Sequence, residues 1–435
     1  MQNLGLFLMN IHADRSLAYP SSIPQWQRLL VISYLALVFL LTSWWSYVGI
    51  VAEHPYKLGD WLINYSAGFV RRGFTGSFFF WLESITGLSP SSTIFIVQVG
   101  SYLIYFAFAG SLLLRQKSIL PYLLLLLSPY VFTFQLSDVG GGYRKEILFL
   151  ALMATTAWTS RYLSTRSFRA VMLATALIYP LLVLSHEMLA AFLPYLVAIY
   201  VIRVKPNIHH LIIVTVALIP SATAFGFAVA YPVTPELVDS MCQGLTTRFP
   251  DICSVNGAID WLDTPLRSAM EQVQYRVESE RFLPIYSLSI LLGIIAFIPI
   301  LGRFTSLLKY PIAAVLTGIS LFGTLVMFPV VLDWGRLIYV NLAALFLLSL
   351  VIPVKQPTQQ PSDGWLKALD LLVGKSPPSR LAFTLLILIA FGYSCFWRIP
   401  HIANAGTEVV VFDRPIYMAK QLWWSIDRLV EERRN

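Results

Sequence analysis

The sequence predicts an all-α, polytopic transmembrane helical bundle of about eleven helices. Of its 435 residues, 57% are hydrophobic and only 12% are charged, whereas a soluble domain carries roughly twice that share of charge. Apolar runs long enough to cross a bilayer core of roughly 30 Å recur from about residue 30 to residue 397. Alternating ten-residue strands are absent, which favours helices over a β-barrel.

Eleven apolar segments are the predicted membrane helices, each bounded by loops with charged or turn-forming residues. In chain order they span about residues 30–52, 92–114, 119–136, 147–160, 170–185, 188–202, 211–231, 284–302, 311–331, 337–354 and 381–397. The segment from Phe74 to Leu88 is also apolar, but it is short and contains Glu83. We therefore expect an interfacial or re-entrant helix there.

The same pattern predicts the domain organisation. Residues 1–354 form the main transmembrane bundle, with a long outer loop at about 232–283 that carries four prolines and many charges. The second half of this loop, near Trp261 to Arg281, is predicted as an amphipathic surface helix. Residues 355–380 form a cytoplasmic linker that starts with Pro, Gln and Ser. Residues 381–435 form the last membrane helix and an outer interfacial tail.

Lysine and arginine predict the orientation, because they are retained on the cytoplasmic side during insertion. With the N-terminus in the cytoplasm, the inside loops hold 15 of the 31 basic residues and only three of the 23 acidic ones. If the segment from Phe74 to Leu88 crossed the bilayer, every later loop would change side and this bias would invert. The C-terminus is therefore expected outside.

The net charge of +8 does not indicate nucleic-acid binding, because the basic residues lie in short loops between apolar segments. Among the three cysteines, Cys395 lies in a predicted helix. Cys242 and Cys253 share the long loop, where they form a disulfide if the loop faces an oxidising compartment. Two reduced thiols are the alternative, and the sequence leaves both open.

Four charged clusters at predicted helix ends form the candidate site: residues 59–73, 137–146, 185–187 and 332–336. All four fall on the predicted outer face. Charges near apolar spans are costly and usually line a wet, functional cavity. The candidate catalytic acids and bases are Asp60, Asp138, Glu146, His186, Glu187 and Asp333. The candidate phosphate-binding residues are Arg71, Arg72, Arg144, Lys145 and Arg336.

The glycine triplet at 140–142 adds to this prediction. It would let the backbone approach a ligand closely, and it opens a helix whose N-terminal amides could face an anion. No metal site is predicted, since the sequence contains no His-x-x-x-His or Cys-x-x-Cys pattern. The carboxylates leave a divalent cation open, and no other cofactor is expected.

Each cluster also has a purely structural interpretation. Arg71 and Arg72 would anchor an interfacial helix to lipid headgroups, and the charges at 144–146 would be ordinary helix-end charges. His186 with Glu187 would form a solvated turn, and residues 333–336 would hold a structural ion pair. These interpretations are less attractive together, because the four clusters share one predicted side.

The many helices, the long outer loop in the second half and the outward Arg and acid clusters resemble bacterial membrane glycosyltransferases of the GT-C class. They also resemble O-antigen and exopolysaccharide polymerases. The resemblance is architectural, covers most of the chain and includes no diagnostic motif. It implies a GT-C-like bundle in the bacterial inner membrane, with Asp60 of the first outer loop as base. In polymerases and ligases, outward arginines and often a histidine act instead; here these are His186 and the arginines named above.

The expected function is glycosyl transfer or polysaccharide polymerisation at the non-cytoplasmic face. The donor would be a sugar linked to polyprenyl phosphate or pyrophosphate, the acceptor a glycan, and the other partners membrane lipids. A transporter or flippase for a lipid-linked or anionic substrate is the alternative, since intramembrane charges and Gly-broken helices occur there too. A structural subunit of an envelope assembly machine is a third. Related halves are not visible, and the polar clusters lie at helix ends rather than at the midplane, which favours the enzyme.

Overall fold

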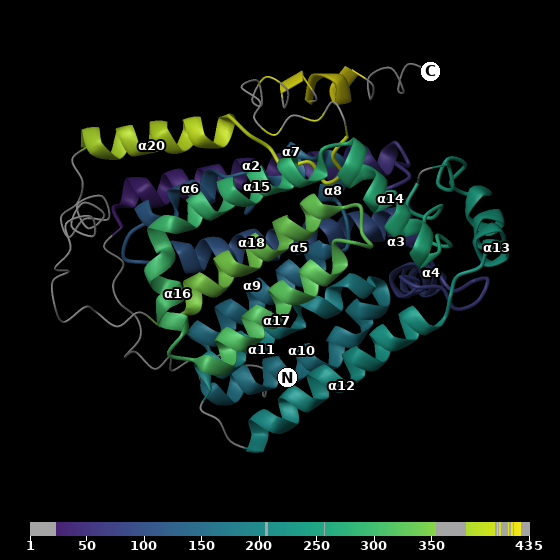
Figure 1. Ribbon diagram of the computed structural model, residues 1–435, viewed down its shortest axis with the longest axis horizontal. Helices are drawn as coiled ribbons and strands as arrows, with labels where there is room; N and C mark the ends of the chain where they lie inside the picture. Colours follow the sequence, from purple (N-terminus) through teal and green to yellow (C-terminus); the bar gives the residue numbers. More distant parts are fainter. Residues whose placement is uncertain are drawn as a thin grey trace.

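The computed structural model of the protein is an all-α bundle. It describes residues 23–204, 208–255, 257–353, 380–404, 407, 409, 416, 419, 420 and 422–427. No strand occurs among these residues. The long helices lie side by side along a common direction, and several short helices gather at one end of the bundle (Figure 1).

The helices that make up the bundle are, in chain order, α2 (Gln25–Val51), α5 (Pro90–Leu113), α9 (Glu146–Tyr162), α10 (Thr165–Ser185), α11 (Leu193–Arg203), α12 (Ile208–Ala230), α15 (Phe282–Phe297), α16 (Leu301–Leu307), α17 (Pro311–Met327), α18 (Trp334–Val351) and α20 (Arg380–Cys395). Within the described residues, six stretches are long and apolar enough to cross a membrane: 25–51, 90–113, 165–185, 212–230, 282–307 and 334–351. The transmembrane character is supported, and the full count of eleven stays a prediction.

The segment predicted as one helix at 119–136 is broken in the structure. It contains a 3-10 turn at Leu120–Tyr122, then α6 (Leu123–Leu127), and after an irregular stretch α7 (Phe134–Ser137). The break falls at Ser128, whose backbone is extended because Pro129 follows it. Polar side chains satisfy the freed backbone groups; Thr133 Oγ1, for example, donates to the Ser128 carbonyl at 3.0 Å.

Helix α18 lies at the centre of the bundle. Every residue of this helix except Leu345 is buried, and the helix packs against α5, α9, α11 and α15. The outer helices instead expose large apolar side chains, such as Leu40 of α2 (64%), Leu177 of α10 (62%) and Val229 of α12 (63%). Such exposure is unfavourable in water and is typical of helices that face lipid hydrocarbon.

The two ends of the bundle differ in charge. Helices α2, α10, α12 and α17 finish at one end, and α9, α15 and α18 start there; we call it the charged end, because the four charged clusters lie on it. The opposite end carries only basic charges among the described residues, and we call it the basic end. Its Lys and Arg residues whose side chains the structure describes are Arg28, Arg115, Lys117, Arg161, Arg166, Arg169, Arg203, Arg303 and Lys309.

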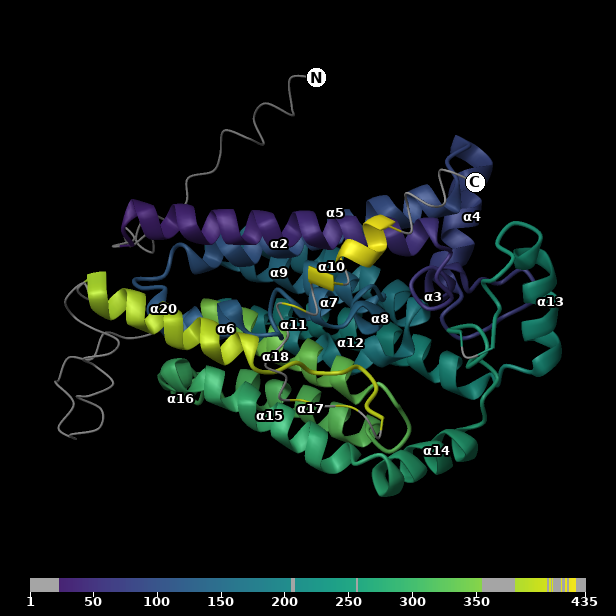
Figure 2. The ribbon, with the colours of Figure 1, turned by 90° about the horizontal axis from the view of Figure 1, so that it is seen from above.

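Helix α4 (Phe74–Thr86) is the segment predicted to be interfacial or re-entrant. It begins after Gly73 and ends at Gly87, which adopts a left-handed conformation (φ 73°) that glycine tolerates. Figure 2 shows α4 running across the direction of the long helices rather than along it. This arrangement agrees with a segment that does not cross the bilayer.

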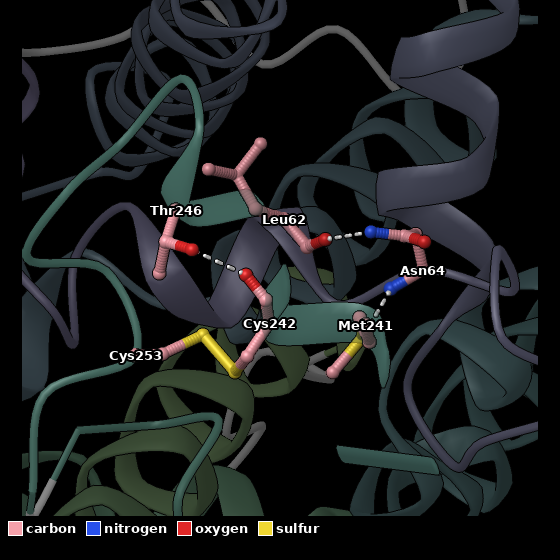
Figure 3. Close-up of a disulfide and its surroundings, with 6 residues drawn as sticks. All are labelled: Leu62, Asn64, Met241, Cys242, Thr246 and Cys253. Atoms are coloured by element: carbon pink, nitrogen blue, oxygen red, sulfur yellow. Dashed lines mark hydrogen bonds between the residues drawn. A yellow bond between two sulfur atoms is a disulfide. The ribbon is translucent and has the colours of Figure 1, made fainter. Parts of the chain in front are cut away.

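The long loop at 232–283 folds over the charged end. It contains α13 (Pro235–Thr246), which was not predicted, and α14 (Leu266–Ser279), which lies within the predicted amphipathic stretch. A disulfide joins Cys242 to Cys253, so the structure pairs the two thiols. Next to it, the Asn64 backbone N–H contacts Met241 Sδ at 3.5 Å, which places α13 against the first loop (Figure 3).

Two predicted segments are described only in part. The linker at 355–380 lies outside the described residues except for Arg380, which begins α20. In the tail, Trp423 and Trp424 are exposed (68% and 57%). Trp44 Nε1 of α2 donates a hydrogen bond to Ser425 Oγ at 3.1 Å, so this part of the tail lies against α2.

The predicted orientation is testable by cysteine labelling in a Cys395→Ser background. Glu271 in the long loop and Lys309 at the basic end are both exposed. We expect Glu271→Cys to react with a membrane-impermeant maleimide in intact cells, because the charged end faces outward. Lys309→Cys should react only after permeabilisation, and the reverse pattern would show an inverted protein.

Candidate functional site

The four charged clusters meet at the charged end of the bundle. Asp60 lies in α3 (Gly59–Leu62), and Arg71 and Arg72 lie in the turn before α4. Residues 144–146 lie at the start of α9, which begins at Glu146, and residues 333–336 lie at the start of α18, which begins at Trp334. His186 and Glu187 follow α10, which ends where His186 becomes extended. Each cluster therefore lies at or next to a helix end, and the packing of the helices brings these ends together.

Arg72 and Glu187 form an ion pair in which both carboxylate oxygens accept hydrogen bonds. Arg72 Nη2 lies 2.7 Å from Glu187 Oε1, and Arg72 Nε donates to Oε2 at 2.9 Å. Arg72 has a left-handed backbone (φ 69°), which is unfavourable for a non-glycine residue. Burial alone would raise the pKa of Glu187, but Arg72 and His186 hold it well below its usual value. Glu187 is therefore ionised and has its charge matched.

Arg71 is anchored beside this pair. Its guanidinium donates to the backbone carbonyls of Leu262 and Trp261, both at 3.1 Å, and lies 3.9 Å from Glu187. These contacts attach the long loop to the turn before α4. Arg71 is thus held by the protein itself and is less available to a ligand than the sequence predicts.

Lys145 is fully buried and donates to two backbone carbonyls. Its ammonium donates to the carbonyl of Arg72 at 3.0 Å and to that of Ser185 at 3.1 Å. Burial lowers the pKa of Lys145 to about 8. Two of its three donors are therefore used to join α10, α9 and the turn at Arg72, so Lys145 positions the site, and its role as a phosphate ligand stays a prediction.

Asp60 and Arg144 form a second ion pair, with no exposed surface on Asp60. Arg144 Nε lies 3.3 Å from Asp60 Oδ2, and Arg144 Nη2 donates to Oδ1 at 3.4 Å. Burial would raise the pKa of Asp60, but Arg144 and Lys145 outweigh it and lower the pKa. The contact is long, and neither Arg144 Nε nor Asp60 Oδ2 has a hydrogen-bond partner in the described structure.

His186 lies between two carboxylates. Its Nε2 is 3.6 Å from Glu146, and its Nδ1 is 3.7 Å from Glu187. Burial, together with Arg72, lowers the pKa of His186 well below its usual value, so the ring is neutral at physiological pH. Neither ring nitrogen has a hydrogen-bond partner in the described structure.

Arg336 joins the third and fourth clusters. Its Nη1 donates to Glu146 Oε1 at 2.8 Å, and its Nη2 donates to Asp333 Oδ2. Its Nε has no hydrogen-bond partner among the described residues. Arg336 and Arg144 share one narrow pocket, which is lined by Tyr102, Gly141, Gly142, Arg144, Glu146, Ile147, Arg336 and Tyr339.

Asp138 pairs with a histidine that the sequence analysis missed. Asp138 caps α8 (Val139–Gly142) by accepting from the Gly141 N–H at 2.9 Å. It also binds Nδ1 of His401 at 2.7 Å and accepts from the His401 backbone N–H at 2.6 Å. Burial would lower the pKa of His401, but Asp138 raises it above the usual value. The ring keeps 27% exposure.

The glycine triplet makes room for His401 and for Gln135. A Cβ atom on Gly141 would lie 2.5 Å from His401 Cβ, and one on Gly142 would lie 2.3 Å from Gln135 Cα. Moreover, α9 begins only at Glu146. The expected close approach of the backbone is therefore to the protein's own His401 and Gln135, and the triplet does not open α9.

The sequence analysis also missed Lys57, which is buried between the rings of Trp45 and Tyr143. Its Nζ lies 5.5 Å and 5.1 Å from the two ring centroids, a cation–π arrangement. Burial lowers the pKa of Lys57 to about 7. The sequence signal that could have identified Lys57 was its position three residues before Asp60. For His401 the signal was the Pro-His pair shortly after the last predicted helix.

The predicted residues are balanced in charge: there are five basic candidates and five carboxylates, of which Asp138 binds His401, and His186 is neutral. An anion that enters must therefore replace a carboxylate at one of the arginines. Arg144 and Arg336 are the best placed for this exchange, because each has an Nε–H without an acceptor. Among the described residues, no three His, Cys, Asp or Glu side chains are grouped so as to hold a metal ion.

The Arg72–Glu187 pair should contribute strongly to stability. Arg72→Ala leaves a largely buried carboxylate (16% exposed) without its main partner, and we expect a loss of about 3 kcal/mol in the free energy of unfolding in mixed micelles. The double variant Arg72→Ala/Glu187→Ala should lose less than the sum of the single variants. The exposed pair of Arg248 and Glu83 (2.6 Å) is the control, and Arg248→Ala should change stability by less than about 1 kcal/mol. Equal losses in the free energy of unfolding from Arg72→Ala and Arg248→Ala would contradict a stabilising role for the Arg72–Glu187 pair.

The comparisons with known proteins leave the family open. The chain matches no protein-family model, no curated protein and no solved structure. The resemblance to GT-C glycosyltransferases stays a prediction from the sequence.

Proposed function

We propose that the protein is a membrane transferase that binds the phosphate or pyrophosphate of a lipid-linked sugar and passes the sugar to a glycan acceptor. The observation that carries this proposal is the pocket shared by Arg144 and Arg336, which lies at one end of an apolar bundle. Both arginines have an Nε–H without an acceptor, and both face a neighbouring carboxylate that a phosphate can replace.

The side chains of this pocket match phosphate in their chemistry. A guanidinium presents several N–H donors in one plane, which matches the oxygen atoms of a phosphate. The surrounding residues exclude water, so each charge interaction is stronger than it would be in solution. Donors already in place would stabilise the negative charge that develops on the departing phosphate.

A lipid-linked donor fits the surroundings of the pocket. The charged end lies at the ends of the apolar helices, where a phosphate attached to a polyprenyl chain would stand at the membrane surface. The predicted outer face holds no soluble nucleotide sugar, which favours a donor carried in the membrane. The bacterial inner membrane, the GT-C-like arrangement and the eleven spans belong to this proposal.

The acceptor hydroxyl needs a base. Asp60 is fully buried and ion-paired, so it is poorly placed to receive a proton from a bound acceptor. Asp138 instead orients His401, whose ring is partly exposed and has Nε2 directed away from the Asp138 contact. We therefore place proton removal at His401, with Asp138 holding the ring and stabilising its charged form.

The arginines are tested by turnover of a radiolabelled polyprenyl-phosphate- or pyrophosphate-linked sugar with purified protein in liposomes. Arg144→Gln and Arg336→Gln should each reduce the rate by about 10²–10³, the usual effect of losing one donor to a developing charge. Arg248→Gln, an exposed arginine on the same end, should keep the wild-type rate. Full activity in both pocket variants would end the proposal, and substrate flux without conversion would identify a transporter.

The base is tested by the pH dependence of the same reaction. His401→Gln should reduce the rate by about 10²–10⁴. In the wild type, activity should fall as the pH drops through the raised pKa of His401, because the imidazolium form cannot accept a proton. Asp138→Asn removes the interaction that raises this pKa, so the acidic limb should move to lower pH. An unchanged limb in Asp138→Asn would contradict the role of His401.

A further inference from the structure

Three arginines meet at the basic end, on helices far apart in the sequence. Arg161 lies in the last turn of α9, Arg203 ends α11, and Arg303 lies in α16. Arg203 Nε donates to the carbonyl of Ser160, the residue directly before Arg161. Arg303 contacts Gln116, which lies just after α5, and α5 packs against α9. In agreement with this packing, burial lowers the pKa of Arg161, and the charges of Arg303 and Arg203 lower it further.

Arg303 is held in a fixed position. Its Nη1 donates to the Ser349 carbonyl at 3.0 Å, and its Nη2 donates to Gln116 Oε1 at 2.7 Å. Gln116 is itself fixed, because its amide nitrogen donates to the carbonyl of Leu112 at 3.0 Å. The guanidinium also stacks over Tyr122, at 5.3 Å from the ring centroid. All of these partners are neutral, so the positive charge of Arg303 is not compensated.

Arg203 and Arg161 complete the group. Arg203 Nε donates to the Ser160 carbonyl at 2.8 Å, which again is a neutral acceptor. No hydrogen bond or salt bridge is found for Arg161 within the part of the chain that the structure describes. The described connections at the basic end contain no Asp or Glu.

The helix ends alone do not balance these charges. α9 and α11 terminate here, and a helix C-terminus carries a partial charge of roughly −0.5. Two such ends offset about one positive charge of the three. This explains why arginines are tolerated at these positions, but it leaves a net positive group that is only partly exposed to water.

We propose that Arg161, Arg203 and Arg303 bind the phosphate of an anionic phospholipid headgroup. A phosphate matches the guanidinium donors, and its negative charge relieves the repulsion among the three side chains. A lipid is the source because large apolar side chains lie exposed beside Arg303, including Leu301 (55%), Leu308 (71%) and Ile312 (56%). These side chains would contact the acyl chains. By the predicted orientation, the lipid belongs to the cytoplasmic leaflet.

The test uses the full chain in nanodiscs, with lipid retention read by native mass spectrometry. In mixtures of phosphatidylglycerol and phosphatidylcholine, the wild type should retain phosphatidylglycerol preferentially. Arg161→Gln should weaken this preference about tenfold, and its unfolding temperature without added lipid should match the wild type because Arg161 has no protein acceptor to lose. Arg166→Gln removes an exposed charge at the same end and should leave the preference unchanged.

Three outcomes would overturn the site. Equal retention of the two lipids by the wild type would show that the site has no preference for an anionic headgroup. An equal effect of Arg161→Gln and Arg166→Gln would show a diffuse surface charge instead of a built site. Displacement of phosphatidylglycerol by millimolar inorganic phosphate would show that the three arginines bind free phosphate and not a lipid.

Discussion

The buried ion pair between Arg336 and Glu146 is the interaction on which the charged end depends. It joins the first turn of the central helix α18 to the first turn of α9, and both side chains are almost completely buried. Burying either charge alone would be strongly unfavourable. Each of the other ion pairs follows the same rule, so the fold can bring five basic groups together only by supplying a carboxylate for nearly every one of them.

This rule allowed much of the site to be predicted. Charges at the ends of apolar helices can only lie at a membrane surface, so the positions of the helices place the four clusters on one face. The individual partners depend on packing between helices and were not accessible. For example, Arg72 pairs with Glu187, 115 residues away in the chain, and Arg144 pairs with Asp60, 84 residues away. The sequence does not distinguish these pairs from the exchanged ones, Arg72 with Asp60 and Arg144 with Glu187.

Other features were missed for physical reasons of the same kind. The break at Pro129 is a local signal, but the long apolar run around it favoured a single helix. His401 contacts Asp138 across 263 residues, and no local pattern connects them. The glycines at 140–142 were predicted to approach a ligand, whereas they make room for the His401 ring and for Gln135. A glycine run indicates close contact but not the partner of that contact.

The contacts of Lys145 give the charged end a mechanical property. Its ammonium joins the Ser185 carbonyl at the end of α10 to the Arg72 carbonyl, while the opposite flank of α10 exposes Leu173, Leu177 and Ile178. A helix with such a flank adjusts its tilt when the hydrocarbon layer becomes thinner or thicker. An adjustment of α10 would reach Arg72 by two routes, through Lys145 to its backbone and through Glu187 to its guanidinium. A change in the thickness of the membrane that tilted α10 would therefore act on the arginine cluster.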